Sequence, residues 1–274
     1  MKIAVAQIAC TVGNVDANLG KIRVFAEQAR EGGAEWVIFP EMADTGYVMS
    51  VIREKASVWS KGAVPELQSI AKEVAVGIMC GVSEREGSAI FNSQVLINAN
   101  GAVIGKYRKT HLFAPLPVEE HKCFTAGAEL VALPMGDLRA GLSICYDLRF
   151  PEIYRALALE QRANIFLVSS AWPVARLEHL RTLAAARAIE NQTYLVLSNR
   201  VGADNGVIFC GNSAIINPAG VFVAAASCEY EELLQADISL SLLETVRARM
   251  PVFTHRRPEV YNAKIGQGVI SLRE

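Results

Sequence analysis

Residues 141–152, GLSICYDLRFPE, lead an apolar run to Cys145 and then place three charged side chains, Asp147, Arg149 and Glu152, directly behind it. The apolar part predicts a buried strand over residues 139–145, with Cys145 at its carboxyl end. Pro151 is typical of a first helical turn, and a second apolar run at 164–170 predicts another strand. This part of the chain therefore reads as a β-α-β unit.

The N-terminal part of the chain repeats this unit. Residues 3–9, IAVAQIA, predict a strand, the segment after Asp16 has apolar residues at helical spacing, and WVIF at 36–39 predicts the next strand. GAEWVIFP at 33–40 and RANIFLVSS at 162–170 also resemble each other. We infer a weak internal duplication, which favours a layered sandwich with pseudo-twofold symmetry.

Further elements alternate between helix and strand. A helix beginning at Pro65 and a strand over 76–82 precede a hairpin, in which Asn100 and Gly101 are both expected to take a positive φ. A helix over 177–191, a strand over 193–199 and a hairpin at Pro218-Ala219-Gly220 follow. The pattern predicts an α/β or α-β-β-α arrangement with mixed sheets, in one domain over residues 1–274.

Composition and charge restrict the class of partner. The 274 residues are 51% hydrophobic and 20% charged, and the formal net charge is -1. Such a chain lacks the basic surface that nucleic acid or an anionic membrane requires, and no apolar run is long enough to span a bilayer. The six cysteines form no C-x-x-C pair, which argues against a disulfide framework or a zinc site. We therefore expect a cytoplasmic protein with a small-molecule ligand and no metal.

Cys145 is the candidate nucleophile. A cysteine at a strand end, just before a helix, is expected to lie where backbone N-H groups and the helix dipole favour the thiolate. Free cysteines are more often simple buried hydrophobes, and we expect this of the other five. Cys145 differs because the polar residues after it indicate a cleft at the strand end.

Two residues are candidates for the base that a thiol nucleophile needs. His111, in KYRKTHLF, would make a Cys-His hydrolase, but the sequence offers it no obvious orienting partner. Glu41 follows an apolar strand and Pro40, so it is expected at a strand end, where partial burial would raise its pKa.

Lys109 ends the predicted hairpin. The basic residues around it are typical of a solvated edge strand. However, alternation along a strand puts Lys106 and Arg108 on one face and Lys109 on the other. Lys109 can therefore point inward, where its ammonium would stabilise an oxyanion.

Three segments together resemble the nitrilase superfamily of carbon-nitrogen hydrolases: FPE at Glu41, YRKTHLF at Lys109 and ICYDLRFPE at Cys145. The resemblance extends over nearly the whole chain. It implies an α/β fold of the α-β-β-α sandwich type, a Glu-Lys-Cys triad at these positions and a second glutamate between the lysine and the cysteine. We assign that glutamate to Glu120, with Glu119 as the competing choice.

The resemblance also implies a reaction and an assembly. Glu41 would accept the thiol proton, Cys145 would attack an amide carbonyl to give a thioester, and the N-H of Tyr146 would help Lys109 to bind the oxyanion. No metal or organic cofactor is implied. Subunits of the family pair into dimers or larger homo-oligomers, so we expect the tail from about residue 250 to pack at a subunit interface.

The residues after the nucleophile indicate the branch of the superfamily. Nitrile-hydrolysing members typically follow their cysteine with Trp-Glu, whereas the Tyr-Asp-Leu-Arg-Phe here resembles the amidase branches. Omega-amidases, which act on a dicarboxylate monoamide, share this form. Carbamoylases for N-carbamoyl amino acids often carry two consecutive arginines where this chain has Leu148 and Arg149, so that alternative is weaker but stays open.

Further residues are candidates for the pocket wall. Tyr47, after Glu41, and Trp172, after the strand that follows the nucleophile, are expected there together with Tyr146 and Arg149, although aromatic residues at such places are often core. Asn199 and Arg200 end another strand, and the sequence does not decide between a binding and a structural role for them. A non-catalytic binding protein or scaffold remains the alternative of a different class, but all three triad residues are present.

Overall fold

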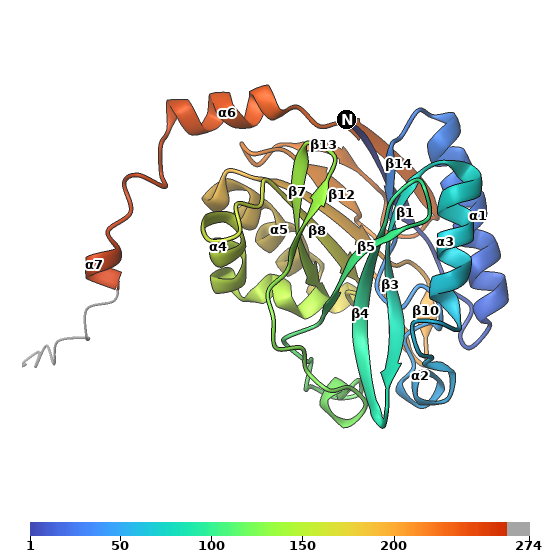
Figure 1. The fold of residues 1–274 in the computed structure, drawn as a ribbon. Helices are drawn as coiled ribbons and strands as arrows, with labels where there is room; N and C mark the ends of the chain where they lie inside the picture. The colour runs from blue at the N-terminus through green and yellow to red at the C-terminus, as the bar shows by residue number, and fades with distance from the viewer. Residues whose placement is uncertain (262–274) are drawn as a thin grey trace, which may run out of the picture.

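Two six-stranded mixed sheets form the centre of the molecule, in a computed structural model that describes residues 1–261 (Figure 1). The first sheet contains, in spatial order, β14 (Glu232–Asp237), β1 (Lys2–Gln7), β2 (Trp36–Ile38), β3 (Gly77–Glu86), β4 (Ala89–Ile97) and β5 (Val103–Arg108). The second contains β13 (Phe222–Ala225), β12 (Ala214–Ile216), β9 (Tyr194–Asn199), β8 (Ile165–Ser170), β7 (Leu138–Ile144) and β6 (Ala132–Met135).

The two sheets share one strand arrangement. Strands β1, β2 and β3 are parallel, as are β7, β8 and β9. In the first sheet, the antiparallel strand β14 flanks the parallel set on one side and the antiparallel pair β4–β5 flanks it on the other. In the second sheet, β6 and the pair β12–β13 take the same places. The predicted mixed sheets and internal duplication are therefore confirmed.

The hairpin turns repeat in detail, but one prediction about them is wrong. The Asn98 side chain accepts hydrogen bonds from the backbone N-H groups of Asn100 and Ala102. In the second hairpin, the Asn217 side chain accepts from the N-H groups of Ala219 and Val221. Of the predicted pair in the first turn, Gly101 alone has a positive φ, at 80°, because the Asn98 side chain supports a longer loop that needs one left-handed residue.

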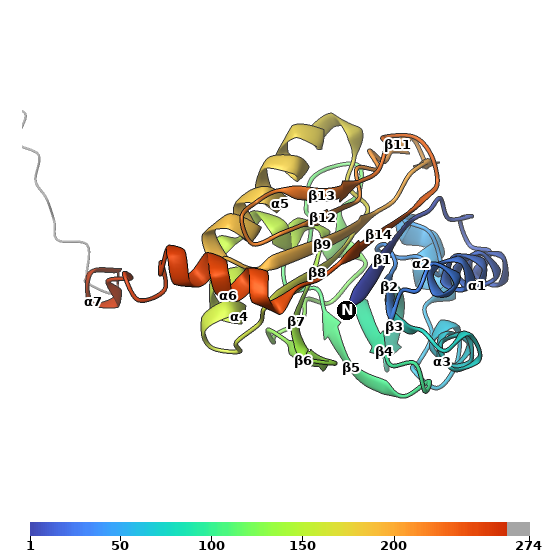
Figure 2. The ribbon, with the colours of Figure 1, turned by 90° about the horizontal axis from the view of Figure 1, so that it is seen from above.

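Helices cover the outer face of each sheet and complete the α-β-β-α sandwich (Figure 2). Helices α1 (Val15–Glu31) and α3 (Ala63–Val74) lie on the first sheet, and α4 (Pro151–Leu159) and α5 (Leu177–Asn191) lie on the second. The Asn14 side chain caps α1 by accepting from the N-H of Ala17 at 3.1 Å. Helix α3 begins two residues before the predicted start at Pro65, at Ala63.

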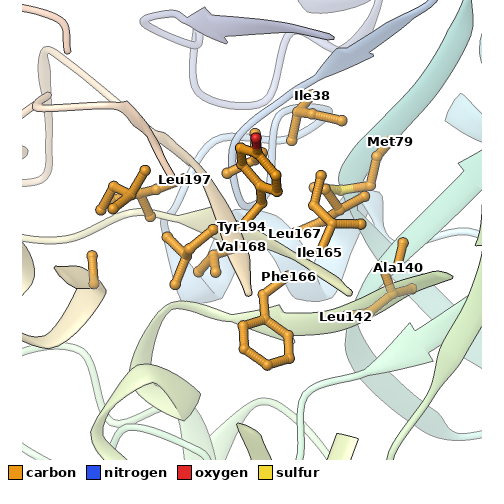
Figure 3. Close-up of a cluster of buried hydrophobic side chains, with 14 of the residues drawn as sticks. Ile38, Met79, Ala140, Leu142, Ile165, Phe166, Leu167, Val168, Tyr194 and Leu197 are labelled. Atoms are coloured by element: carbon orange, nitrogen blue, oxygen red, sulfur yellow. The ribbon is translucent and has the colours of Figure 1, made fainter. Parts of the chain in front are cut away.

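The main core lies between the sheets and continues under α4 and α5. Ile38 and Met79 of the first sheet face Ile165 and Leu167 of the second (Figure 3). Alternate side chains of β8 point the other way, so that the Phe166 ring meets the Tyr154 ring of α4 edge-on, with centroids 5.0 Å apart. Strand β8 is buried on both faces, as its continuous apolar run indicates.

The C-terminal segment follows the last strand of the first sheet. Helix α6 (Leu240–Arg249) packs on the main core through its buried Leu243, and Gln192 Nε2 donates to the carbonyl oxygen of Met250 at its end. The short α7 (Pro258–Tyr261) lies away from the two sheets (Figure 1). The predicted tail begins at about residue 250, and its part over 262–274 lies outside the described residues. Within 1–261, no helix combines the length and the apolar character needed to cross a membrane. The subunit interface expected for the tail stays a prediction.

Candidate active site

Glu41 lies fully buried in the loop that follows β2. Its Oε1 accepts from Lys109 Nζ at 2.9 Å and from Asn92 Nδ2 at 2.6 Å, and its Oε2 accepts from the N-H of Ala171 at 2.8 Å. Since Ala171 directly follows β8, the Glu41 carboxylate connects the two sheets. Burial raises the pKa of this carboxyl, Lys109 lowers it and Glu120 raises it. The net result is a raised pKa.

A glycine allows β3 to pass beneath this loop. A Cβ atom on Gly81 would lie 2.6 Å from Glu41 Cα and 2.5 Å from the carbonyl oxygen of Pro40, which is closer than side-chain atoms can approach backbone. The position of the Glu41 carboxylate therefore depends on the absence of a side chain at residue 81.

Lys109 follows β5 and points inward, as strand alternation predicts. Its side chain is fully buried, and Nζ lies 2.9 Å from Glu41 Oε1 and 2.8 Å from Glu120 Oε1. Burial alone would lower the pKa of Lys109, but the two carboxylates outweigh burial, and the pKa is raised. Lys106 and Arg108, on the other face, both pair with Glu84.

Glu120, rather than Glu119, is the second glutamate beside Lys109. Its Oε1 also accepts from the Tyr47 hydroxyl at 2.7 Å, and its Oε2 accepts from the N-H of Phe113 at 2.6 Å. Glu119 has a positive φ and pairs instead with Lys122 at 2.7 Å. The backbone at these residues places Glu120, and not Glu119, beside Lys109.

Asn92, in the middle of β4, completes the group of charged residues but was not found from the sequence. Its Nδ2 donates to Glu41 Oε1 at 2.6 Å and to Glu120 Oε1 at 3.1 Å. The available signal was a run of polar residues in the middle of an apolar strand: Asn92 and Gln94 point to the same side of β4, and both are buried. We call Glu41, Asn92, Lys109 and Glu120 the buried polar cluster.

Cys145 begins a short 3₁₀ turn, Cys145–Arg149, with a φ of 47° that is strained for a residue other than glycine. Its side chain borders a pocket, although only 8% of the residue is exposed. The helix dipole expected at Cys145 is wrong, because α4 begins only at Pro151, whereas a backbone N-H, that of Ala171, does favour the thiolate. Burial raises the pKa of the Cys145 thiol, Glu41 raises it further, and Lys109 lowers it. The net result is a raised pKa.

Asp147 fixes the turn that carries Cys145. Its buried carboxylate accepts from the N-H of Ile144 at 2.9 Å and from the Tyr107 hydroxyl at 2.8 Å. His111 Nδ1 lies 2.9 Å from the same carboxylate, and the His111 ring stacks on Phe150 with centroids 3.7 Å apart. His111 does not line the pocket beside Cys145, so the geometry disfavours it as the base.

The pocket beside Cys145 opens to solvent, and all four predicted wall residues line it: Tyr47, Tyr146, Arg149 and Trp172. Its remaining lining is mainly apolar, but it includes Arg176, which the sequence analysis did not single out. A concave, mostly apolar site with a few polar groups suits a small molecule.

Two arginines give the pocket a positive charge. The Arg149 guanidinium lies 4.8 Å from the centre of the Trp172 ring, and that of Arg176 lies 5.4 Å from the centre of the Phe113 ring. Among the described residues, neither guanidinium is within 4.0 Å of a carboxylate. Burial lowers the pKa of Arg149. This charge is available to a bound anion.

Asn199 and Arg200, whose roles the sequence left open, support the pocket wall from behind. Asn199 Oδ1 accepts from the N-H of Trp172 at 2.7 Å. Arg200 is fully buried and pairs with Asp204 at 2.5 Å, and the same Asp204 carboxylate accepts from the N-H of Tyr47 at 2.7 Å. Arg200 is therefore engaged by the protein itself and not directed at a ligand.

We predict that Gly81→Ala displaces Glu41 and slows the alkylation of Cys145 by iodoacetamide roughly tenfold or more, because sub-ångström positioning governs proton transfer. The rate is measured at Cys145 by peptide mass spectrometry. Gly20→Ala, in α1, is the matched control, since a Cβ there meets nothing within 4 Å. Equal rates in the two variants would contradict this role of Gly81.

Comparison with known proteins gives a consistent family. The family model for carbon-nitrogen hydrolases matches residues 2–248. The chain is similar to a 2-oxoglutaramate amidase from Bacillus subtilis, with 33% identity over 260 residues that cover 94% of this chain and 98% of that protein. An omega-amidase from Yersinia enterocolitica is 32% identical over 249 residues, which cover 88% of this chain and 90% of that protein.

Solved structures agree with these relatives. A mutant amidase from Nesterenkonia sp. AN1, in complex with butyramide, matches with a TM-score of 0.83 and 29% identity, over 95% of each chain. In another mutant of that amidase, acrylamide has undergone Michael addition at the active-site cysteine. By the extent of the family match and by these relatives, the chain belongs to the carbon-nitrogen hydrolases of the nitrilase superfamily.

Proposed function

We propose that this protein hydrolyses the amide of a small molecule to a carboxylate and ammonia, through a thioester on Cys145. The observation that carries the proposal is the position of the Cys145 thiol, which borders a small-molecule pocket and lies in the electrostatic range of Glu41 and Lys109. The amidase relatives support the same reaction class.

Glu41 is the proposed base and acid. Because burial raises the pKa of the Cys145 thiol, the thiol stays protonated in the empty pocket and loses its proton to Glu41 as the sulfur attacks the amide carbon. The raised pKa of Glu41 then suits the return of that proton to the departing nitrogen, which leaves as ammonia. Water hydrolyses the thioester with Glu41 again as the base, which restores the thiol.

Lys109 and a backbone N-H are the proposed oxyanion donors. The raised pKa of Lys109 keeps its ammonium charged throughout the reaction, and the N-H of Tyr146 adjoins the sulfur in the 3₁₀ turn. Glu120 holds Lys109 in place and assists in orienting the substrate or the water. The proposed reaction uses only groups of the protein and water, and so we propose that it needs no metal or organic cofactor.

The substrate is proposed to carry a carboxylate remote from its amide. Arg149 and Arg176 supply the pocket with positive charge that no carboxylate among the described residues neutralises, and guanidinium groups bind carboxylates through charge-assisted hydrogen bonds. A dicarboxylate monoamide, the substrate type of an omega-amidase, has this form. An N-carbamoyl amino acid also carries a carboxylate and is the second candidate on the same observation.

An ammonia-release assay tests the reaction. We expect turnover of ω-amides or carbamoyl amino acids, weak turnover of nitriles, and a loss of about a thousandfold or more in Cys145→Ala, since no other group replaces the nucleophile. Cys228→Ala is the matched control because Cys228 is exposed and lies outside the pocket. Turnover in folded Cys145→Ala at the control rate would refute the proposal.

Substitution of the arginines tests the substrate class. We predict that Arg149→Gln or Arg176→Gln raises KM for a dicarboxylate monoamide about tenfold or more and leaves KM for butyramide nearly unchanged, because only the first substrate loses a charge-assisted hydrogen bond. Steady-state kinetics provide the measurement, with Arg181→Gln on the exposed face of α5 as the control. Equal changes for both substrates would exclude carboxylate recognition by these residues.

We also propose a homodimer or larger homo-oligomer in the cytoplasm. The exposed apolar side chains of Met250, Val260 and Tyr261 support packing of the tail on a second subunit. We predict that a chain ending at residue 249 forms assemblies with fewer subunits than the full chain does, as measured by analytical ultracentrifugation. The same number of subunits per assembly in the two forms would exclude a role of the tail in assembly.

A further inference from the structure

Asn92 occupies a central place between the two glutamates of the buried polar cluster. It lies on β4 next to Ser83 of β3, and its backbone oxygen accepts from the N-H of Lys109 at 2.9 Å. The Asn92 amide and the Lys109 ammonium donate to the same two atoms, Glu41 Oε1 and Glu120 Oε1. Two carboxylate oxygens thus share two nitrogen donors.

The other end of the Asn92 side chain indicates why an amide is present. Its Oδ1 is buried and has no hydrogen-bond partner among the described residues. A buried polar atom without a partner destabilises the fold, and an apolar side chain of similar size would avoid that cost. The N-H groups of Asn92 are therefore the part of the side chain that the site uses.

We propose that Asn92 is a positioning residue that keeps Glu41 ionised and in place beside Cys145, so that Glu41 can accept the thiol proton. The inference rests on the proposed function, since it assigns Asn92 a part in the same proton transfer. It differs from the roles of the glutamates and the lysine because Asn92 exchanges no proton and acts only through Glu41.

Lys109 alone is not enough to keep Glu41 ionised. One ammonium is shared by two carboxylates, so that the ionised cluster carries one net negative charge without access to solvent. Burial and Glu120 raise the pKa of Glu41, and the Asn92 hydrogen bond acts together with Lys109 to lower it. Asn92 supplies this stabilisation as a neutral dipole, which adds no charge to the pocket.

The titratable and charged groups in the electrostatic environment of Glu41 come from several elements and stay the same when Asn92 is replaced: Lys109, Glu120, Cys145, Tyr47 and Arg200. Removal of the amide donors should therefore shift protonation of Glu41 to higher pH. The expected sign is fixed, because a weaker hydrogen bond to the ionised form raises a carboxyl pKa.

The test follows the rate of Cys145 alkylation by iodoacetamide as a function of pH, by peptide mass spectrometry, and needs no substrate. In the wild-type protein the rate should fall on acidification as Glu41 takes a proton. Asn92→Leu keeps the volume and removes both donors, and its acidic midpoint should lie about one pH unit higher. Asn92→Ser retains one hydroxyl donor, so its midpoint should lie between the two.

Asn98→Ala is the matched control, because Asn98 lies just beyond the end of the same strand and serves only the hairpin turn. Its midpoint should equal that of the wild type. If neither Asn92→Leu nor Asn92→Ser shifts the midpoint, and circular dichroism shows that both variants are folded, the role of Asn92 is overturned and the proposed function is left intact. A wild-type rate without an acidic fall overturns both, since Glu41 is then not the base.

Discussion

The ammonium of Lys109, held between the carboxylates of Glu41 and Glu120, is the interaction on which the rest of the site depends. All three side chains are fully buried, and a buried charge without partners destabilises a fold by several kcal/mol. Both glutamates therefore need further donors, which come from Asn92, from the Tyr47 hydroxyl and from the N-H groups of Phe113 and Ala171. The loops that supply these donors are fixed in place by the charges that they stabilise.

The duplicated architecture divides the chemistry between the sheets. The first sheet and its loops supply Glu41, Asn92 and Lys109, whereas the second sheet ends at Cys145 and at the Ala171 N-H. The core of Ile38 and Met79 against Leu167 keeps the two halves in register (Figure 3). The sulfur and its proposed proton acceptor thus lie at the junction between the two sheets of the sandwich.

Local patterns in the sequence predicted much of this arrangement. Strand alternation turned Lys109 inward, and apolar runs with the residues after them located Glu41 and Cys145 at strand ends. What local patterns could not predict depends on tertiary contacts: Asn92 interacts with residues distant in sequence, and Arg176 reaches the pocket only through the turn after Trp172. The helix dipole predicted for Cys145 is wrong because a 3₁₀ turn separates Cys145 from α4, and local sequence patterns do not indicate the length of such a turn.

A double-mutant cycle on folding stability tests the central claim most directly. Lys109→Met and Glu120→Gln are made singly and together, and the free energy of unfolding is measured by urea denaturation. If the buried ion pairs govern the site, the two effects are strongly non-additive, with a coupling of roughly 1–3 kcal/mol and a double variant little worse than either single one. Additive effects would contradict the account, because each charge would then be tolerated in the interior without the other.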